Sequence, residues 1–207
     1  GREYYVPTAS ANSFQLWDAP SGGNRITWTT SGTSVVGGSY CVFADSVLGK
    51  YVLKGLTIGT GNGAYGMKIS NSSLDISTCD FNGNFNNYGH VWCESNSNIY
   101  FKDSWSVSVG TNNDNMFLAS DSGYISMRLS TCTITASITV GTGNFLWAYR
   151  SGVLLADACT WVNASNLTGK RGLASVNGIL RTSSTLTPGN AAPTTATGGQ
   201  YEDSGSI

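Results

Sequence analysis

The stretch that decides the fold is residues 105–134, WSVSVGTNNDNMFLASDSGYISMRLSTCTI. It opens on Trp105-Ser106-Val107 and closes on Cys132-Thr133-Ile134, two units with the same apolar-polar-apolar order. Units of this kind recur at steps of 23, 26, 27, 27 and 27 residues: Leu56-Thr57-Ile58, Cys79-Asp80-Phe81, Trp105-Ser106-Val107, Cys132-Thr133-Ile134, Cys159-Thr160-Trp161 and Leu186-Thr187-Pro188. A fixed period of this length indicates a repeat architecture.

Two further columns of apolar residues keep nearly the same period. One contains Leu74, Ile99, Ile125, Val153 and Ile179, and the other contains Met67, Val91, Phe117, Leu146 and Leu173. Ser, Asn and Gly turns separate the columns, so each period holds three short alternating strands. In a parallel β-helix, equivalent residues of successive coils lie about 4.8 Å apart, and like residues then stack on like.

We therefore predict an all-β fold, a right-handed parallel β-helix of about five coils. The hand follows from the rule for parallel crossovers. A β-sandwich is the alternative, but it predicts turns about every 8–12 residues without a fixed long period.

The predicted β-helix occupies residues 51–187. Residues 1–50 do not join the repeat, and we expect an N-terminal segment that caps the exposed strand edges of the first coil. Residues 188–207 are expected to be an extended C-terminal tail that lies on a neighbouring chain.

The charge of the chain argues against several classes of function. Only 11% of residues are charged, and the net charge is −1. Because nucleic-acid binding needs clustered Lys and Arg, no nucleic-acid partner is expected. No stretch reaches the roughly 18 apolar residues of a membrane span, so no membrane insertion is expected.

The five cysteines have no metal-site spacing, and we expect reduced, buried side chains, with no metal and no cofactor.

Two motifs lie at the ends of the chain. The first is Arg2-Glu3-Tyr4-Tyr5-Val6, and the second runs from Pro188-Gly189-Asn190-Ala191-Ala192 through Thr194 to Tyr201. Both look like the C-terminal domains of phage and prophage tail-fibre and tailspike proteins, a family with β-helical coils. The chain departs from the family after the opening motif, where only Ala44-Asp45-Ser46 and Gly49-Lys50-Tyr51 remain of a longer segment.

The resemblance implies a homotrimeric appendage of a virus particle, assembled in the bacterial cytoplasm and acting outside the cell. It also implies contacts with other virion proteins and with a host cell-surface glycan. We expect this chain to serve in host-surface recognition, or in structural support for it, rather than as a dedicated enzyme.

A trimer interface is predicted from the alternation of side chains. If Val91, Phe117, Leu146 and Leu173 point inward, the residues that follow them point outward in one apolar stripe. This stripe would contain Trp92, Leu118, Trp147 and Ala174. An aligned apolar stripe usually marks an interface, and closed symmetric assemblies bury one. The alternative is that inside and outside are exchanged on this face, with Trp92 and Trp147 in the core.

Glycan binding is predicted for exposed aromatic side chains, because flat rings together with Asn, Ser and Thr hold neutral sugars. The candidates are Tyr88, Tyr100, Tyr124 and Tyr149. Trp92 and Trp147 are further candidates, although neither can serve as both interface and glycan contact.

Two alternative functions remain open. A polysaccharide-degrading tailspike, whether glycoside hydrolase or lyase, would need paired carboxylates. Glu94 and Asp121, which lie 27 residues apart, are the candidate catalytic pair. The single histidine, His90, is expected at the surface. The other alternative is a purely structural head or baseplate fibre.

Overall fold

The structure is a computed structural model of the 207-residue chain. It describes residues 9–10, 13–14, 16–17, 25–26, 40–46, 50–58, 65–83, 89–108, 111–112, 115–183 and 188–203.

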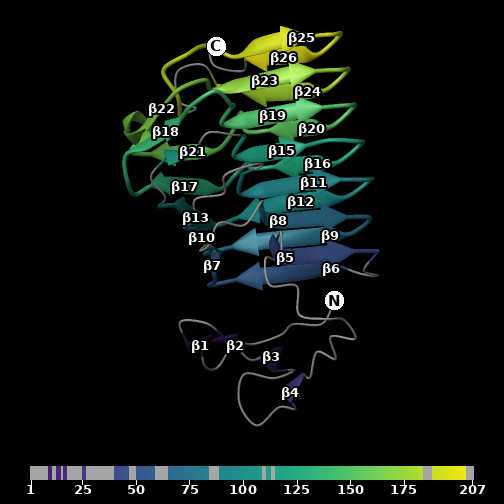
Figure 1. The fold of residues 1–207 in the computed structure, drawn as a ribbon, viewed down its shortest axis with the longest axis vertical. Helices are drawn as coiled ribbons and strands as arrows, with labels where there is room; N and C mark the ends of the chain where they lie inside the picture. The colour runs from purple at the N-terminus through teal and green to yellow at the C-terminus, as the bar shows by residue number, and fades with distance from the viewer. Residues whose placement is uncertain are drawn as a thin grey trace.

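The described residues from 40 onward form a parallel β-solenoid, in which each strand lies on the equivalent strand of the preceding turn (Figure 1). Sheet 1 consists of β5 (Tyr40–Asp45), β8 (Tyr65–Ser70), β11 (Val91–Glu94), β15 (Phe117–Ala119), β19 (Leu146–Tyr149), β23 (Gly172–Ser175) and β25 (Thr194–Ala196). Sheet 2 consists of β6 (Lys50–Lys54), β9 (Ser73–Ser77), β12 (Asn98–Lys102), β16 (Tyr124–Ser126), β20 (Val153–Leu155), β24 (Ile179–Thr182) and β26 (Gln200–Asp203).

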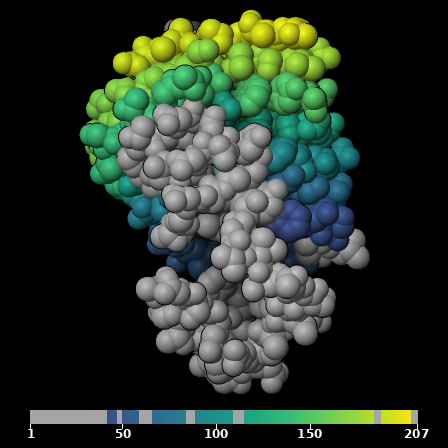
Figure 2. Space-filling model, in the orientation of Figure 1, coloured from purple at the N-terminus to yellow at the C-terminus, as the bar shows by residue number. Residues whose placement is uncertain are grey.

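Two smaller sheets complete the turns. Sheet 3 consists of β7 (Thr57–Ile58), β10 (Asp80–Phe81), β13 (Ser104–Val107), β17 (Thr131–Ile134) and β21 (Thr160–Val162). Sheet 4 consists of β14 (Thr111–Asn112), β18 (Ile138–Val140) and β22 (Leu167–Thr168), and a short 3-10 helix, η1 (Ala164–Asn166), precedes β22. The chain therefore makes five turns through sheets 1, 2 and 3, and the layers rise from the N-terminal to the C-terminal end as bands of colour in Figure 2.

The predicted parallel β-helix is confirmed, and the β-sandwich alternative is wrong. Every described strand pair between successive turns is parallel, such as Trp105 with Cys132. Antiparallel pairing occurs among the described residues only between β1 (Ala9–Ser10) and β2 (Ser13–Phe14), and between β3 (Leu16–Trp17) and β4 (Arg25–Ile26). Most of the predicted N-terminal cap lies outside the described residues.

The solenoid extends past both predicted boundaries. At its start, β5 and β6 already pair with β8 and β9, so the first turn begins at Tyr40. At its end, β25 and β26 pair with β23 and β24. The segment 194–203 is therefore the last layer of the stack rather than a tail lying on a neighbour. The open edges of β23 and β24 carry unpaired backbone N–H and C=O groups. These groups bond to the backbone of the polar segment 194–203 without needing apolar side chains there.

The predicted columns are correct in the first turns and slip in later ones. The slip is two residues in the Trp105 column, where Cys132 pairs with Trp161 rather than with Cys159, and one residue in the other two columns. Ile125 pairs with Leu154 and Leu154 with Leu180, so Val153 and Ile179 point outward. The cause is an insertion, because Val107 to Phe117 spans ten positions whereas Ile134 to Leu146 spans twelve. A slip of one residue exchanges the two faces of a strand.

Aromatic side chains fill the space between the sheets. Trp105 lies 4.4 Å from Phe101 and 5.5 Å from Phe117 between ring centroids. Cys79, Cys93, Cys132 and Cys159 are free and buried, as the sequence predicted. Burial raises the pKa of Cys93 and of Cys159 to about 12, so these thiols serve as apolar core groups. The side chain of Cys41 lies outside the described residues.

Sheets 1 and 2 are joined by a two-residue turn that repeats from layer to layer. In one layer Asp121 and Ser122 have φ of 48° and 65°, and the Gly123 N–H donates to the Ser120 carbonyl at 2.7 Å. Positive φ at both central residues defines a type I′ turn. Arg150-Ser151-Gly152 forms the same turn in the next layer, where the Gly152 N–H donates to the Tyr149 carbonyl at 2.9 Å. These turns hold equivalent side chains of successive layers in straight columns on the outer faces.

Candidate functional site on the outer faces of sheets 1 and 2

The outer face of sheet 1 carries alternate residues of its strands. In β11 Val91 and Cys93 are buried while Trp92 and Glu94 point outward, and β19 repeats this pattern. Strand pairing aligns one outer column across five layers, namely Lys68, Trp92, Leu118, Trp147 and Leu173. The alternative that placed Trp92 and Trp147 in the core is therefore wrong.

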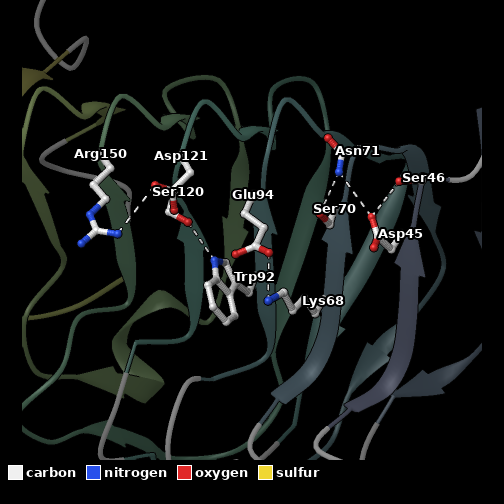
Figure 3. A network of polar contacts seen from close by, with 10 residues as sticks. All are labelled: Asp45, Ser46, Lys68, Ser70, Asn71, Trp92, Glu94, Ser120, Asp121 and Arg150. Carbon is white, nitrogen blue, oxygen red and sulfur yellow. Dashed lines mark hydrogen bonds and ion pairs between the residues drawn. The ribbon is translucent and has the colours of Figure 1, made fainter.

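Trp92 is held from two sides (Figure 3). The Lys68 ammonium lies 3.8 Å from the centroid of the indole ring and 2.9 Å from Glu94 Oε1. The indole N–H donates to Ser120 Oγ, one layer further on, at 2.8 Å. A cation over the ring and a bonded N–H fix this indole, and the Lys68 ammonium occupies part of its surface.

The second indole of the column forms an aromatic pair. The rings of Trp147 and Tyr149 have centroids 5.0 Å apart and an interplanar angle of 34°. The Trp147 N–H donates to Ser175 Oγ at 3.0 Å. Arg150 lies beside Tyr149, with its guanidinium carbon 4.9 Å from the ring centroid, and 3.9 Å separates Arg150 Nη1 from Asp121 Oδ1. We call Trp147, Tyr149, Arg150 and Asp121 the sheet 1 platform.

Two of the four predicted interface residues are not at the surface. Ala174 is fully buried because it pairs with Ala148 of the core, and Leu173 takes the outer position. Leu118 is only 5% exposed, and it lies between Trp92 and Trp147 in adjacent strands. The continuous exposed apolar stripe on which the interface prediction depended is thus absent from the described part of sheet 1.

Two of the predicted glycan-binding tyrosines meet on the outer face of sheet 2. Tyr100 and Tyr124 have ring centroids 5.7 Å apart at an angle of 51°. The ammonium groups of Lys50 and Lys102 lie 5.4 Å and 5.1 Å from the Tyr100 centroid. We call these four residues the sheet 2 cluster. Tyr149 belongs to the sheet 1 platform instead, and Tyr88 lies outside the described residues.

The two candidate catalytic carboxylates are engaged in separate ion pairs. Cys93 pairs with Ala119, which brings Glu94 level with Ser120 rather than with Asp121. Glu94 faces Lys68, and Asp121 faces Arg150 (Figure 3). A glycosidase places two carboxylates on either side of one sugar, whereas here each carboxylate is paired with its own cation.

His90 is not at the surface, so that prediction was wrong. It is fully buried, with its ring 5.7 Å from Phe81 and 6.0 Å from Phe117. Burial lowers the pKa of His90 to about 3, because desolvation penalises the charged imidazolium. A general base needs access to a substrate, and this ring has none.

The described residues contain no group of three or more His, Cys, Asp or Glu side chains arranged to hold a metal ion. In the same part of the chain no helix has the length and apolar character to cross a bilayer.

The contacts between cationic side chains and aromatic rings were not predicted from the sequence. Lys68 reaches Trp92 from the neighbouring layer, and Lys50 reaches Tyr100 from two layers below, so these contacts require the register of the strands. Arg150 follows Tyr149 directly, and its contact with Asp121 crosses from one turn to the next. The only sequence signal was a basic residue next to a predicted outward aromatic one.

Comparison of the chain with family models, with curated proteins and with solved structures found no match in any of the three. The class that the fold defines is a parallel β-solenoid with aromatic and charged residues on two outer faces.

Proposed function

We propose that this chain is a structural, glycan-binding module of a virion appendage, a tail fibre or tailspike, and that the sheet 1 platform holds a neutral sugar. The proposal rests on the tilted ring pair of Trp147 and Tyr149, flanked by Arg150 and Asp121. The virion location and the homotrimer follow from the resemblance of the two ends of the chain to tail-fibre proteins.

The ring pair suits the apolar face of a sugar. The two rings lie 5.0 Å apart between centroids at an angle of 34°, and sugar C–H groups pack on exposed aromatic faces. The Trp147 N–H is already bonded to Ser175, so the ring is oriented before a ligand arrives. A side chain ordered in advance lowers the entropy cost of binding.

The charged pair beside the rings suits sugar hydroxyls. The side chains of Asp121 and Arg150 are 41% and 58% exposed, and their closest N–O distance is 3.9 Å. A pair this loose leaves carboxylate acceptors and guanidinium donors open to a ligand. Hydroxyl groups both donate and accept, so one sugar ring can bond to both side chains.

A titration of host-surface oligosaccharides against Trp147→Ala and Trp92→Ala tests the proposal. We expect Trp147→Ala to weaken binding about tenfold or more, as loss of a central aromatic contact does. Trp92→Ala is the matched control, because its indole has the same outer position two layers below but lies under Lys68, and we expect unchanged affinity.

Three other results would change the assignment. Equal losses in both variants would place the sugar elsewhere. New reducing ends or unsaturated sugars in the mixture would establish a degrading tailspike. Absence of binding to any glycan would favour a structural head or baseplate fibre. The mass of the protein in solution tests the homotrimer separately.

A further inference from the structure

The sheet 2 cluster is built on the outer face of β12. Ile99 and Phe101 point into the core, whereas Tyr100 and Lys102 point outward. Lys50 comes from β6, two layers below, and Lys102 from the same strand as Tyr100. Both ammonium groups are within the range of a cation–π contact with the Tyr100 ring, which keeps them at this point of the surface.

This part of sheet 2 carries three lysines, Lys50, Lys54 and Lys102, against two aspartates, Asp75 and Asp103, the latter accepting a hydrogen bond from Ser77 Oγ at 3.0 Å. Strand pairing places Lys54 and Lys102 in one outer column, with Ser77 between them. Both lysines are exposed, and neither forms an ion pair with any described residue. Lys50 is neutralised in part by Asp75, whose Oδ2 lies 2.9 Å from Lys50 Nζ. The positive charge here is local, because the chain as a whole has a net charge of −1.

We infer that the sheet 2 cluster is a second binding site, and that its ligand is an acidic sugar, one that carries a carboxylate or phosphate group. The anionic group would accept charge-assisted hydrogen bonds from Lys102 and Lys50, which are stronger than bonds between neutral groups. The Tyr124 ring, 5.7 Å from Tyr100, supplies the apolar contact for the sugar ring.

The charge pattern favours a sugar over a nucleic acid. Nucleic-acid binding requires a basic stripe that contacts many phosphates, and its affinity depends on their number. The two lysines of the cluster and the nearby Lys54, set against Asp75 and Asp103, leave a charge that matches a single anionic group. The inference uses other residues than the sheet 1 platform, on a different sheet, so the two sites can be tested independently.

The test is a titration of the full chain with four ligands of similar length: an oligouronate, its carboxyl-reduced neutral counterpart, a phosphorylated oligosaccharide and a single-stranded oligonucleotide. We expect at least one acidic oligosaccharide to bind about tenfold more tightly than the neutral one. Comparison of the oligouronate with the phosphorylated ligand then identifies the anionic group.

Two variants locate the site. Lys102→Gln should weaken binding of the acidic sugar about tenfold and leave the neutral ligand unaffected. Lys170→Gln removes the same charge from the C-terminal part of the stack and should change neither affinity. Trp147→Ala, which tests the sheet 1 platform, should leave binding of the acidic sugar unchanged.

Several outcomes would overturn the inference. They are equal affinity for acidic and neutral sugars, unchanged affinity in Lys102→Gln, or preferential binding of the oligonucleotide with the same dependence on Lys102. Loss of acidic-sugar binding in Trp147→Ala would also overturn it, by assigning the acidic ligand to the sheet 1 platform.

Discussion

Trp105 and Cys132 are partners in adjacent parallel strands, although 27 residues separate them in the sequence. Trp105 is 3% exposed and Cys132 is fully buried, so both belong to one internal column. Trp161 is the next member, because it pairs with Cys132 in the turn that follows. This column connects three successive layers through the core.

Trp105→Ala should therefore be strongly destabilising. The ring contacts Phe101, Phe117 and Trp161, and its removal leaves a large cavity between three layers. We expect a loss of about 3–5 kcal/mol in the free energy of unfolding, measured by urea denaturation. Trp92→Ala, on the outer face, should cost about 1–2 kcal/mol, because it removes one hydrogen bond and one cation–π contact. Equal losses would contradict the assignment of inner and outer faces.

Gly152→Ala should also destabilise the solenoid. A β-carbon at Gly152 would lie 2.1 Å from the carbonyl oxygen of Ala119 in the layer below. Because that oxygen belongs to the backbone, the layers must separate, and we expect a cost of about 1–3 kcal/mol. The matched control is Ser151→Ala in the same turn, at an exposed position. Thermal unfolding of both variants makes the comparison, and an unchanged Tm in Gly152→Ala would show that the layers are not this closely stacked.

Burial of His90 predicts a dependence of stability on pH. The pKa of His90 is about 3 in the folded chain and 6.5 in the unfolded one. Between these values the unfolded chain binds a proton that the folded chain does not, so acidification favours unfolding. The free energy of unfolding should fall by about 1.4 kcal/mol for each pH unit below 6.5 through this residue alone.

The replacement His90→Leu isolates this effect. Carboxylates titrate alike in both proteins, so the difference between their urea midpoints at pH of about 7 and about 5 reports on His90. We expect the original chain to lose more stability on acidification than His90→Leu. Parallel pH profiles for the two proteins would argue against a buried neutral imidazole.

Removal of residues 188–207 should weaken the solenoid rather than leave it intact. Deletion exposes the edges of β23 and β24, and it removes the bond between Thr182 Oγ1 and the Tyr201 hydroxyl at 2.9 Å. Open strand edges favour association between chains, so we expect a lower Tm and a mass in solution that rises with concentration.

Glu202→Gln is the control for this deletion. It removes the partner of Arg181 but keeps β26, and exposed ion pairs contribute about 0–1 kcal/mol. We expect its Tm to stay close to that of the original chain. An unchanged Tm in the deletion would support the extended tail that the sequence suggested.

The sequence by itself determined the architecture. Apolar-polar alternation reports which strand residues point inward, and a period near 27 residues shows which strands share a column, as with Phe81, Val107 and Ile134. The same alternation placed Trp92, Tyr100 and Trp147 on outer faces. These inferences need only local geometry and a constant repeat.

Only the tertiary structure decided the register after the insertion between β17 and β19, and with it the composition of the two outer faces. The two extra residues lengthen the step from Ile125 to Leu154 to 29, which leaves Val153 and Ile179 outward. A shorter step of 26 from Leu146 to Gly172 turns Leu173 outward and Ala174 inward. The pairing of Lys68 with Trp92, and of Lys50 with Tyr100, depends on which layers lie side by side. The physical reason is that a strand's side chains alternate with a period of two, so one misplaced residue reverses a face, and contacts between layers exist only once the register is set.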